Sequence, residues 1–140
     1  MLTARPFDIL WPPIHDEQSA MDACRIGAVG AVVAAIWIAA ITLYGISEGG
    51  HLGLVRVGAG RFILAAIFLL LAFGIAHQWR PAALIAPVLF LAEQSVSPVG
   101  LNGWMAGVMP WVHALTGTVM VFFVSGVRGS FGYWRLRKLS

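Results

Sequence analysis

The stretch IGAVGAVVAAIWIAAITLYGI, residues 26–46, runs for 21 residues without a charged side chain and ends in the polar segment Ser47-Glu48-Gly49-Gly50. About 20 apolar residues, each rising about 1.5 Å in a helix, cross the roughly 30 Å of hydrocarbon in a bilayer. The stretch therefore predicts a transmembrane helix. We extend it back to residue 17, because Asp16 can accept hydrogen bonds from the N–H groups of a helix that starts there.

Three further apolar runs predict three more spans, at residues 58–77, 81–97 and 104–126. The second carries Arg61 near its start, where a long basic side chain can snorkel out of the hydrocarbon. The third is short and carries Glu93. The segment His77-Gln78-Trp79-Arg80 predicts a tight hairpin between the second and third spans.

The composition favours lipid as the solvent around most of the chain. Of its 140 residues, 59% are hydrophobic and only 11% are charged, whereas a soluble domain usually carries about 25% charged residues. The fold class predicted is an all-α membrane protein with four transmembrane helices in one membrane domain, residues 1–140. Residues 1–16 contain Pro6, Pro12 and Pro13, which predict a non-helical segment lying in the interfacial headgroup zone.

The basic residues predict the orientation. Membrane proteins concentrate Lys and Arg in the short cytoplasmic flanks of their helices. Four spans place Arg56 and Arg61 on one side and seven basic residues on the other, namely Arg5, Arg25, Arg80, Arg128, Arg135, Arg137 and Lys138. Both termini are therefore expected in the cytoplasm, in a multi-pass inner-membrane protein. This placement also argues against nucleic acid as a partner, despite the net charge of +3.

A stripe of small residues follows one face of the first span. Gly27, Ala31, Ala35 and Ala39 lie four residues apart, and such a stripe lets two membrane helices approach closely. It predicts a helix-packing face. The sequence leaves open whether that face packs within the molecule or against another membrane protein or a second copy.

Glu93 is an acidic residue inside the third predicted span, and such a group is costly in hydrocarbon unless it is paired or neutral. Counted along the helices, Glu93 lies on the order of 18 Å from the cytoplasmic end and His113 roughly 12 Å from the outer one, so their depths nearly coincide. We expect Glu93 to face the bundle and to meet His113, Arg61, Thr116 or water. The group could fix helix register, form a proton or cation site, or lie outside the hydrocarbon.

The motifs of catalytic and cofactor sites are missing from the sequence. Cys24 is the single cysteine and offers no zinc cluster. His77 and His113 are predicted at different depths, which argues against haem between two histidines. The segment 126–132 is rich in glycine but lacks the lysine of a phosphate-binding loop. We therefore expect no catalytic, cofactor-binding or metal-binding residue.

The C-terminal tail, residues 127–140, alternates aromatic and basic side chains. Aromatic rings settle at the headgroup level, and basic residues are attracted to anionic lipid. The tail and the interfacial segment therefore predict contact with the lipid surface, or alternatively with a cytoplasmic partner, through Trp11, Tyr133, Trp134, Arg135, Arg137 and Lys138.

The two ends of the chain, RPFDILWPP at residues 5–13 and GVRGSFGY at residues 126–133, resemble those of a group of small four-span bacterial inner-membrane proteins. The resemblance implies four spans and an inner-membrane location, and it implies no activity. The function we expect is that of a non-catalytic accessory or structural subunit that packs against other membrane helices. The alternative is an oligomeric small-solute or proton-coupled transporter or channel that uses Glu93.

Overall fold

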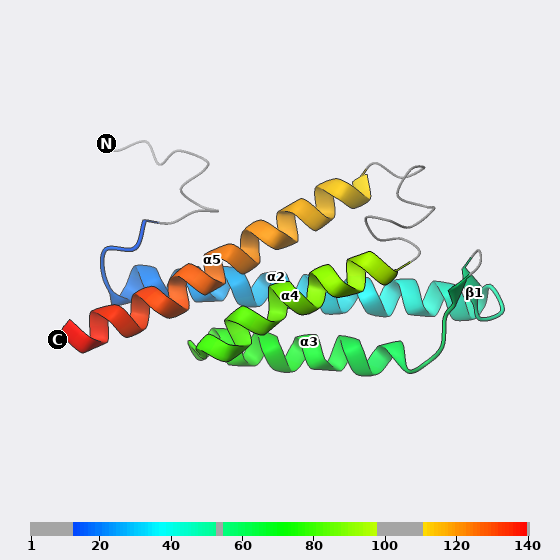
Figure 1. Cartoon of the computed structure of the whole chain (residues 1–140), viewed down its shortest axis with the longest axis horizontal. Helices are drawn as coiled ribbons and strands as arrows, with labels where there is room; N and C mark the ends of the chain where they lie inside the picture. The colour runs from blue at the N-terminus through cyan, green and yellow to red at the C-terminus, as the bar shows by residue number, and fades with distance from the viewer. Residues whose placement is uncertain (1–12, 53–54, 98–110, 140) are drawn as a thin grey trace.

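The computed structural model describes residues 13–52, 55–97 and 111–139, which form four helices and a short hairpin. Consecutive helices run in opposite directions along the long axis, so the start of α2 and the end of α5 lie at the same end (Figure 1). The expected all-α class is confirmed for these residues; the hairpin was not predicted. The helices are α2 (Glu17–Ser47), α3 (Arg61–Ala76), α4 (Arg80–Val96) and α5 (Trp111–Leu139), and the antiparallel strands are β1 (His51–Leu52) and β2 (Val55–Arg56).

Two of the helices, α2 and α5, are long and apolar enough to cross a membrane. With 16 and 17 residues, α3 and α4 reach only about 24 and 26 Å. We expected a helix from residue 58, but α3 begins at Arg61 because Gly58 and Gly60 disfavour helix. Val57 instead donates its N–H to the carbonyl of Gly50 at 2.8 Å.

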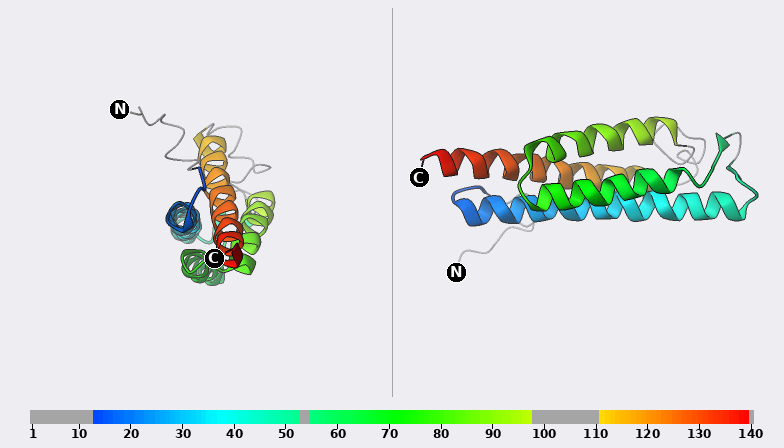
Figure 2. Two further views of the ribbon diagram at one scale, coloured as in Figure 1. Left: turned by 90° about the vertical axis from the view of Figure 1, so that its left-hand side faces the viewer. Right: turned by 90° about the horizontal axis from the view of Figure 1, so that it is seen from below.

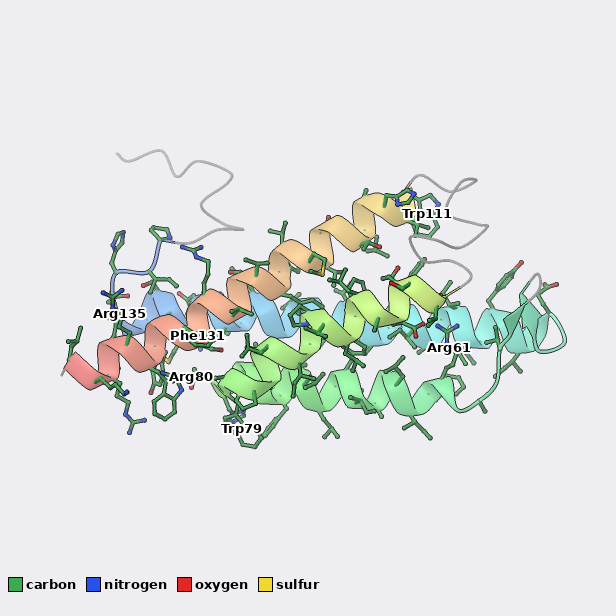
Figure 3. All side chains as sticks on the ribbon, in the orientation of Figure 1. Arg61, Trp79, Arg80, Trp111, Phe131 and Arg135 are labelled. Atoms are coloured by element: carbon green, nitrogen blue, oxygen red, sulfur yellow. The ribbon has the colours of Figure 1, made fainter. Side chains whose placement is uncertain are left out.

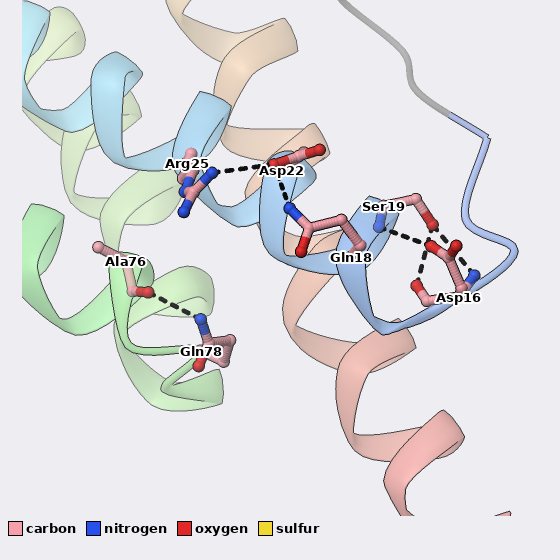
Figure 4. A network of polar contacts seen from close by, with 7 residues as sticks. All are labelled: Asp16, Gln18, Ser19, Asp22, Arg25, Ala76 and Gln78. Carbon is pink, nitrogen blue, oxygen red and sulfur yellow. Dashed lines mark hydrogen bonds and ion pairs between the residues drawn. The ribbon is translucent and has the colours of Figure 1, made fainter.

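Local side-chain chemistry fixes where α2 begins. The Asp16 carboxylate accepts a hydrogen bond from the Ser19 N–H at 2.8 Å, and the Ser19 hydroxyl accepts one from the Asp16 N–H at 3.1 Å (Figure 4). This capping box satisfies two N–H groups that lack helical partners. The hydrogen bonds from Ser19, that of its N–H above all, hold the pKa of Asp16 below its usual value.

The turn between α3 and α4 requires a left-handed residue, and Gln78 supplies it with φ of +57°. Trp79 donates its N–H to the carbonyl of Gly74 at 2.9 Å, and the Gln78 amide donates to the carbonyl of Ala76 at 2.8 Å (Figure 4). A Cβ on Gly74 would lie 2.7 Å from the Cβ of Ala82. The predicted tight hairpin therefore closes with direct contact between the two helices.

The large aromatic side chains of the core come from α3, α4 and α5, whereas α2 contributes mainly small ones. Phe68 of α3, Phe90 of α4 and Phe123 of α5 pack together at ring-centroid separations of 5.7–6.4 Å. The face that α2 turns to them carries mainly alanines and glycines, all of them buried. Because α2 offers little volume there, the rings of the other helices can fill the space at native density.

Helices α2 and α5 approach each other closely at their glycines. A Cβ on Gly27 would lie 2.4 Å from the Cα of Gly126, and one on Gly129 would lie 2.7 Å from the carbonyl oxygen of Ala20. Both distances are shorter than real Cβ atoms show. The glycine-rich segment 126–132 is part of helix α5. Its small residues allow α5 to contact α2 this closely.

We expect Gly126→Ala to lower the free energy of unfolding by about 1–3 kcal/mol, because its methyl group meets the α2 backbone. The matched control is Gly117→Ala in the same helix, where a Cβ meets nothing within 4 Å. This control should leave stability unchanged or raise it by up to about 1 kcal/mol. Titration with sodium dodecyl sulfate in mild detergent micelles, followed by circular dichroism, measures both. Equal effects would contradict the contact.

Candidate functional site

A buried ion pair lies where the start of α3 meets the end of α4. Arg61, the first residue of α3 and labelled in Figure 3, forms it with Glu93 in the last turn of α4. The Glu93 side chain is 7% exposed and that of Arg61 is 19% exposed. The two charges neutralise each other in a largely buried site, and the pair links the start of α3 to the end of α4.

Other polar side chains surround the pair and connect it to α5. Arg61 Nη2 donates to Ser97 Oγ at 3.5 Å, and Ser97, which caps the C-terminus of α4, is buried. Next to Glu93 along the chain, Gln94 accepts a hydrogen bond from Thr116 Oγ1 at 3.3 Å, and both side chains are buried. The cluster therefore joins α3, α4 and α5 through polar contacts.

His113 is not part of this cluster. Its neighbours Val112 and Thr116 are buried, but the His113 side chain is exposed. The structure records no hydrogen bond or ion pair between the described residues His113 and Glu93. The two residues were predicted at nearly the same depth in the membrane. The depth of a residue does not determine which face of its helix it occupies. The partner of Glu93 is Arg61, which the sequence had offered as one of several.

The small-residue stripe of α2 packs inside the molecule. Gly27, Ala31 and Ala35 are buried and Ala39 is half-buried, and the stripe lies against α5 and α3. The matching residues on α5 were missed. Buried Ser125, Gly126, Gly129 and Ser130 have the four-residue spacing that marks the stripe on α2, so the same rule applied to residues 125–130 would have found them.

The opposite end of the molecule gathers aromatic and basic residues around Arg80. The Arg80 guanidinium carbon lies 5.2 Å from the Phe131 ring centroid and 5.0 Å from that of Trp134. Trp134 Nε1 donates to the carbonyl of Gln78 at 3.2 Å. Five of the side chains predicted to contact lipid or a partner are among the described residues. Tyr133 is half-buried, and the exposed ones are Trp134, Arg135, Arg137 and Lys138. Trp11 lies outside the described residues.

The arrangement constrains the chemistry that the molecule can perform. Within residues 13–52, 55–97 and 111–139, no three His, Cys, Asp or Glu side chains come together to hold a metal ion. The Glu93 carboxylate is paired with the Arg61 guanidinium. The Arg61–Glu93 pair can set the register of two helices, and the Arg80 end can attract anions.

We expect Glu93→Ala to lower the free energy of unfolding by about 3–5 kcal/mol, because it leaves the Arg61 cation buried without a partner. The double variant Arg61→Leu/Glu93→Leu removes both charges and should be neutral or stabilising. Titration with sodium dodecyl sulfate in mild detergent measures both variants. A double variant as unstable as Glu93→Ala would show that the cost comes from lost packing and not from the unpaired charge.

Comparison of the sequence with protein-family models and with curated proteins, and of the structure with solved structures, found no significant match.

Proposed function

We propose that the chain is a four-span inner-membrane protein of bacterial type that acts without catalysis, as an accessory subunit packed against other membrane helices. The observation that carries the proposal is the distribution of side-chain size. Alanine is the commonest buried hydrophobic residue of the bundle, whereas many large apolar side chains are exposed on all four described helices. Leu70 is 72% exposed, Val88 69% and Ile36 63%. Such a surface is stable against hydrocarbon and costly against water.

The two short helices belong to the same apolar exterior. Ile63 and Phe73 are exposed on α3, near its two ends, and Ile85 is exposed on α4. Each helix begins with an arginine, Arg61 or Arg80, and long basic side chains reach the headgroups from a helix end. We infer that the α3–α4 hairpin crosses the bilayer twice, which raises the number of spans from two to four.

The distribution of charge supports the proposed orientation. At the end where α2 starts and α5 stops, α5 alone contributes Arg128, Arg135, Arg137 and Lys138. At the other end, Arg61 is neutralised by Glu93. An excess of basic residues marks the cytoplasmic side, so both termini are proposed to lie there.

Reporter fusions test this topology. A reporter that is active only in the cytoplasm, fused after Gln78 or after Leu139, should be active, and the same reporter fused after Gly50 should be silent. A periplasm-specific reporter at the three positions should give the reverse pattern. If the fusion after Gln78 matches the one after Gly50, the hairpin does not cross and the four-span proposal fails.

The proposed partner surface is the outer face of α4. This helix packs on α3 and α5 but hardly touches α2, and Figure 2 shows α2 and α4 on opposite sides of α5. Its outer face carries an apolar groove of about 320 Å³ lined by Leu84, Ile85, Val88, Leu89 and Ala92. Helices pack by placing ridges into grooves of this kind. Because the stripe on α2 is used inside the molecule, α4 is the surface that we assign to a transmembrane helix of another subunit.

The alternative function, an oligomeric transporter or channel, is favoured by one observation: Glu93 is an ionisable group buried in an apolar bundle. Its pairing with Arg61 leaves no net charge to select or carry an ion. Replacing Glu93 by Gln separates the two functions. A transporter loses flux in proteoliposomes, whereas the accessory subunit retains its partner.

A photo-crosslinking residue at Val88 tests the partner surface. In native membranes we expect it to yield one adduct of defined mass, because the α4 groove is covered by the partner helix. The matched control is Ile36 on α2, which is similarly exposed but lies away from that groove. Recovery of the chain as a lone monomer in mild detergent, with no adduct at Val88, would refute the accessory role.

A further inference from the structure

Two cavities at the end where α3 turns into α4 share Arg80 as a wall. The smaller, of about 260 Å³, is lined by Trp79, Arg80, Pro81 and Trp134. The larger, of about 440 Å³, is lined by Arg80, Phe131, Gly132, Arg135 and Lys138. Figure 3 shows the side chains labelled Trp79, Arg80, Phe131 and Arg135 gathered at this end, contributed by the α3–α4 turn and by α5.

The guanidinium of Arg80 is held in place without being neutralised. The Phe131 and Trp134 rings lie about 5 Å from it, and the bond from Trp134 to the Gln78 carbonyl fixes the second ring. Arg80 Nε is buried and has no hydrogen-bond partner among the described residues. Among residues 13–52, 55–97 and 111–139, no carboxylate lines either cavity. An ordered, uncompensated guanidinium binds a phosphate with little loss of side-chain freedom.

The larger cavity is lined by cations and the smaller one is mainly apolar, which matches the charged headgroup and the apolar chains of a phospholipid. The larger contains three cations, Arg80, Arg135 and Lys138, which suit phosphate oxygens. The smaller is walled by Trp79, Pro81 and Trp134, and its surface is mainly apolar, which suits glycerol carbons and the first methylenes of an acyl chain. Indole rings also favour this depth in a bilayer.

We propose that this end of the molecule is a binding site for an anionic glycerophospholipid, with the headgroup phosphate between Arg80, Arg135 and Lys138 and the glycerol end of the acyl chains against Trp79 and Trp134. The three cations exceed the charge of one phosphate, so a lipid with two phosphates is bound more tightly than a lipid with one. The proposal rests on the membrane location proposed above, which puts this end at the cytoplasmic leaflet, where a protein meets anionic lipids.

The test uses the full chain, delipidated in neutral detergent, and counts bound lipids by native mass spectrometry. The probes are diphosphatidylglycerol, phosphatidylglycerol and phosphatidylcholine, each titrated separately. We expect affinity to fall in that order. Arg135→Gln/Lys138→Gln should weaken diphosphatidylglycerol binding by about 30-fold, because each basic contact with anionic lipid contributes roughly a factor of five.

The matched control is Arg25→Gln/Arg137→Gln, which removes the same charge from residues that line neither cavity. It should change binding by less than about fivefold. A third variant, Arg80→Lys, keeps the charge but loses the flat contact with the two rings, and it should weaken binding. Circular dichroism of each variant checks that the bundle is folded. We expect no loss of structure in Arg135→Gln/Lys138→Gln, because both side chains are exposed.

Three results would overturn the proposal. Equal binding of phosphatidylcholine would show a non-selective apolar contact, and equal losses in the two double variants would show an effect of net charge alone. Displacement of lipid by soluble glycerol phosphate at comparable concentration would identify a site for a free phosphate and not for a lipid. Each can occur while the crosslink at Val88 and the fusion reporters still behave as expected, so the failure of the lipid site is distinguishable from the failure of the accessory function.

Discussion

The bundle depends on a contact in which two helices meet through their backbones. Gly27 and Gly126 leave so little room between α2 and α5 that a single methyl group would collide with the opposite chain. This approach fixes the two longest helices as one unit, and the remaining helices complete it. Phe68, Phe90 and Phe123 then fill the volume that the alanines of α2 leave free. In such an interior, dispersion forces between close surfaces supply the cohesion.

Charge is handled differently at the two ends of the bundle. At one end Arg61 and Glu93 form an ion pair that is largely buried, with Ser97 beside it. At the other end Arg80 lies about 5 Å from two aromatic rings, and Arg135 and Lys138 line a cavity with it. The described residues therefore place a paired cation at one end and a cluster of cations at the other. That asymmetry supports both the proposed orientation and the proposed lipid site.

Much of the fold follows from the sequence, because the apolar runs mark α2, α3 and α4 to within a few residues. The end of α5 was missed: the helix continues through the polar tail to Leu139, well beyond residue 126, where the apolar run stops. The start of α3 was missed because residues 58–60, which include two glycines, were counted into the helix to give it the length of a span. The cluster around Glu93 was predicted only in part: chain position gives depth, but whether His113 or Arg61 meets the carboxylate depends on helix rotation, which packing decides. The role of Arg80 could not be predicted, since its rings lie about 50 positions further along the chain. Trp11 and the segment 98–110 fall outside the described residues.

The unequal helix lengths have a consequence for the lipid around the molecule. In the proposed setting, α3 and α4 offer about 24–26 Å of helix to a hydrocarbon layer of roughly 30 Å, while α2 and α5 exceed it. The bilayer must thin beside the α3–α4 hairpin and relax again beside the longer pair, at a cost of a fraction of a kcal/mol for each ångström. Other short helices match the thinned bilayer beside α3 and α4, so they are favoured on that side of the molecule. Hydrophobic mismatch would therefore bring a partner to α4 before any side chain of the groove touches it.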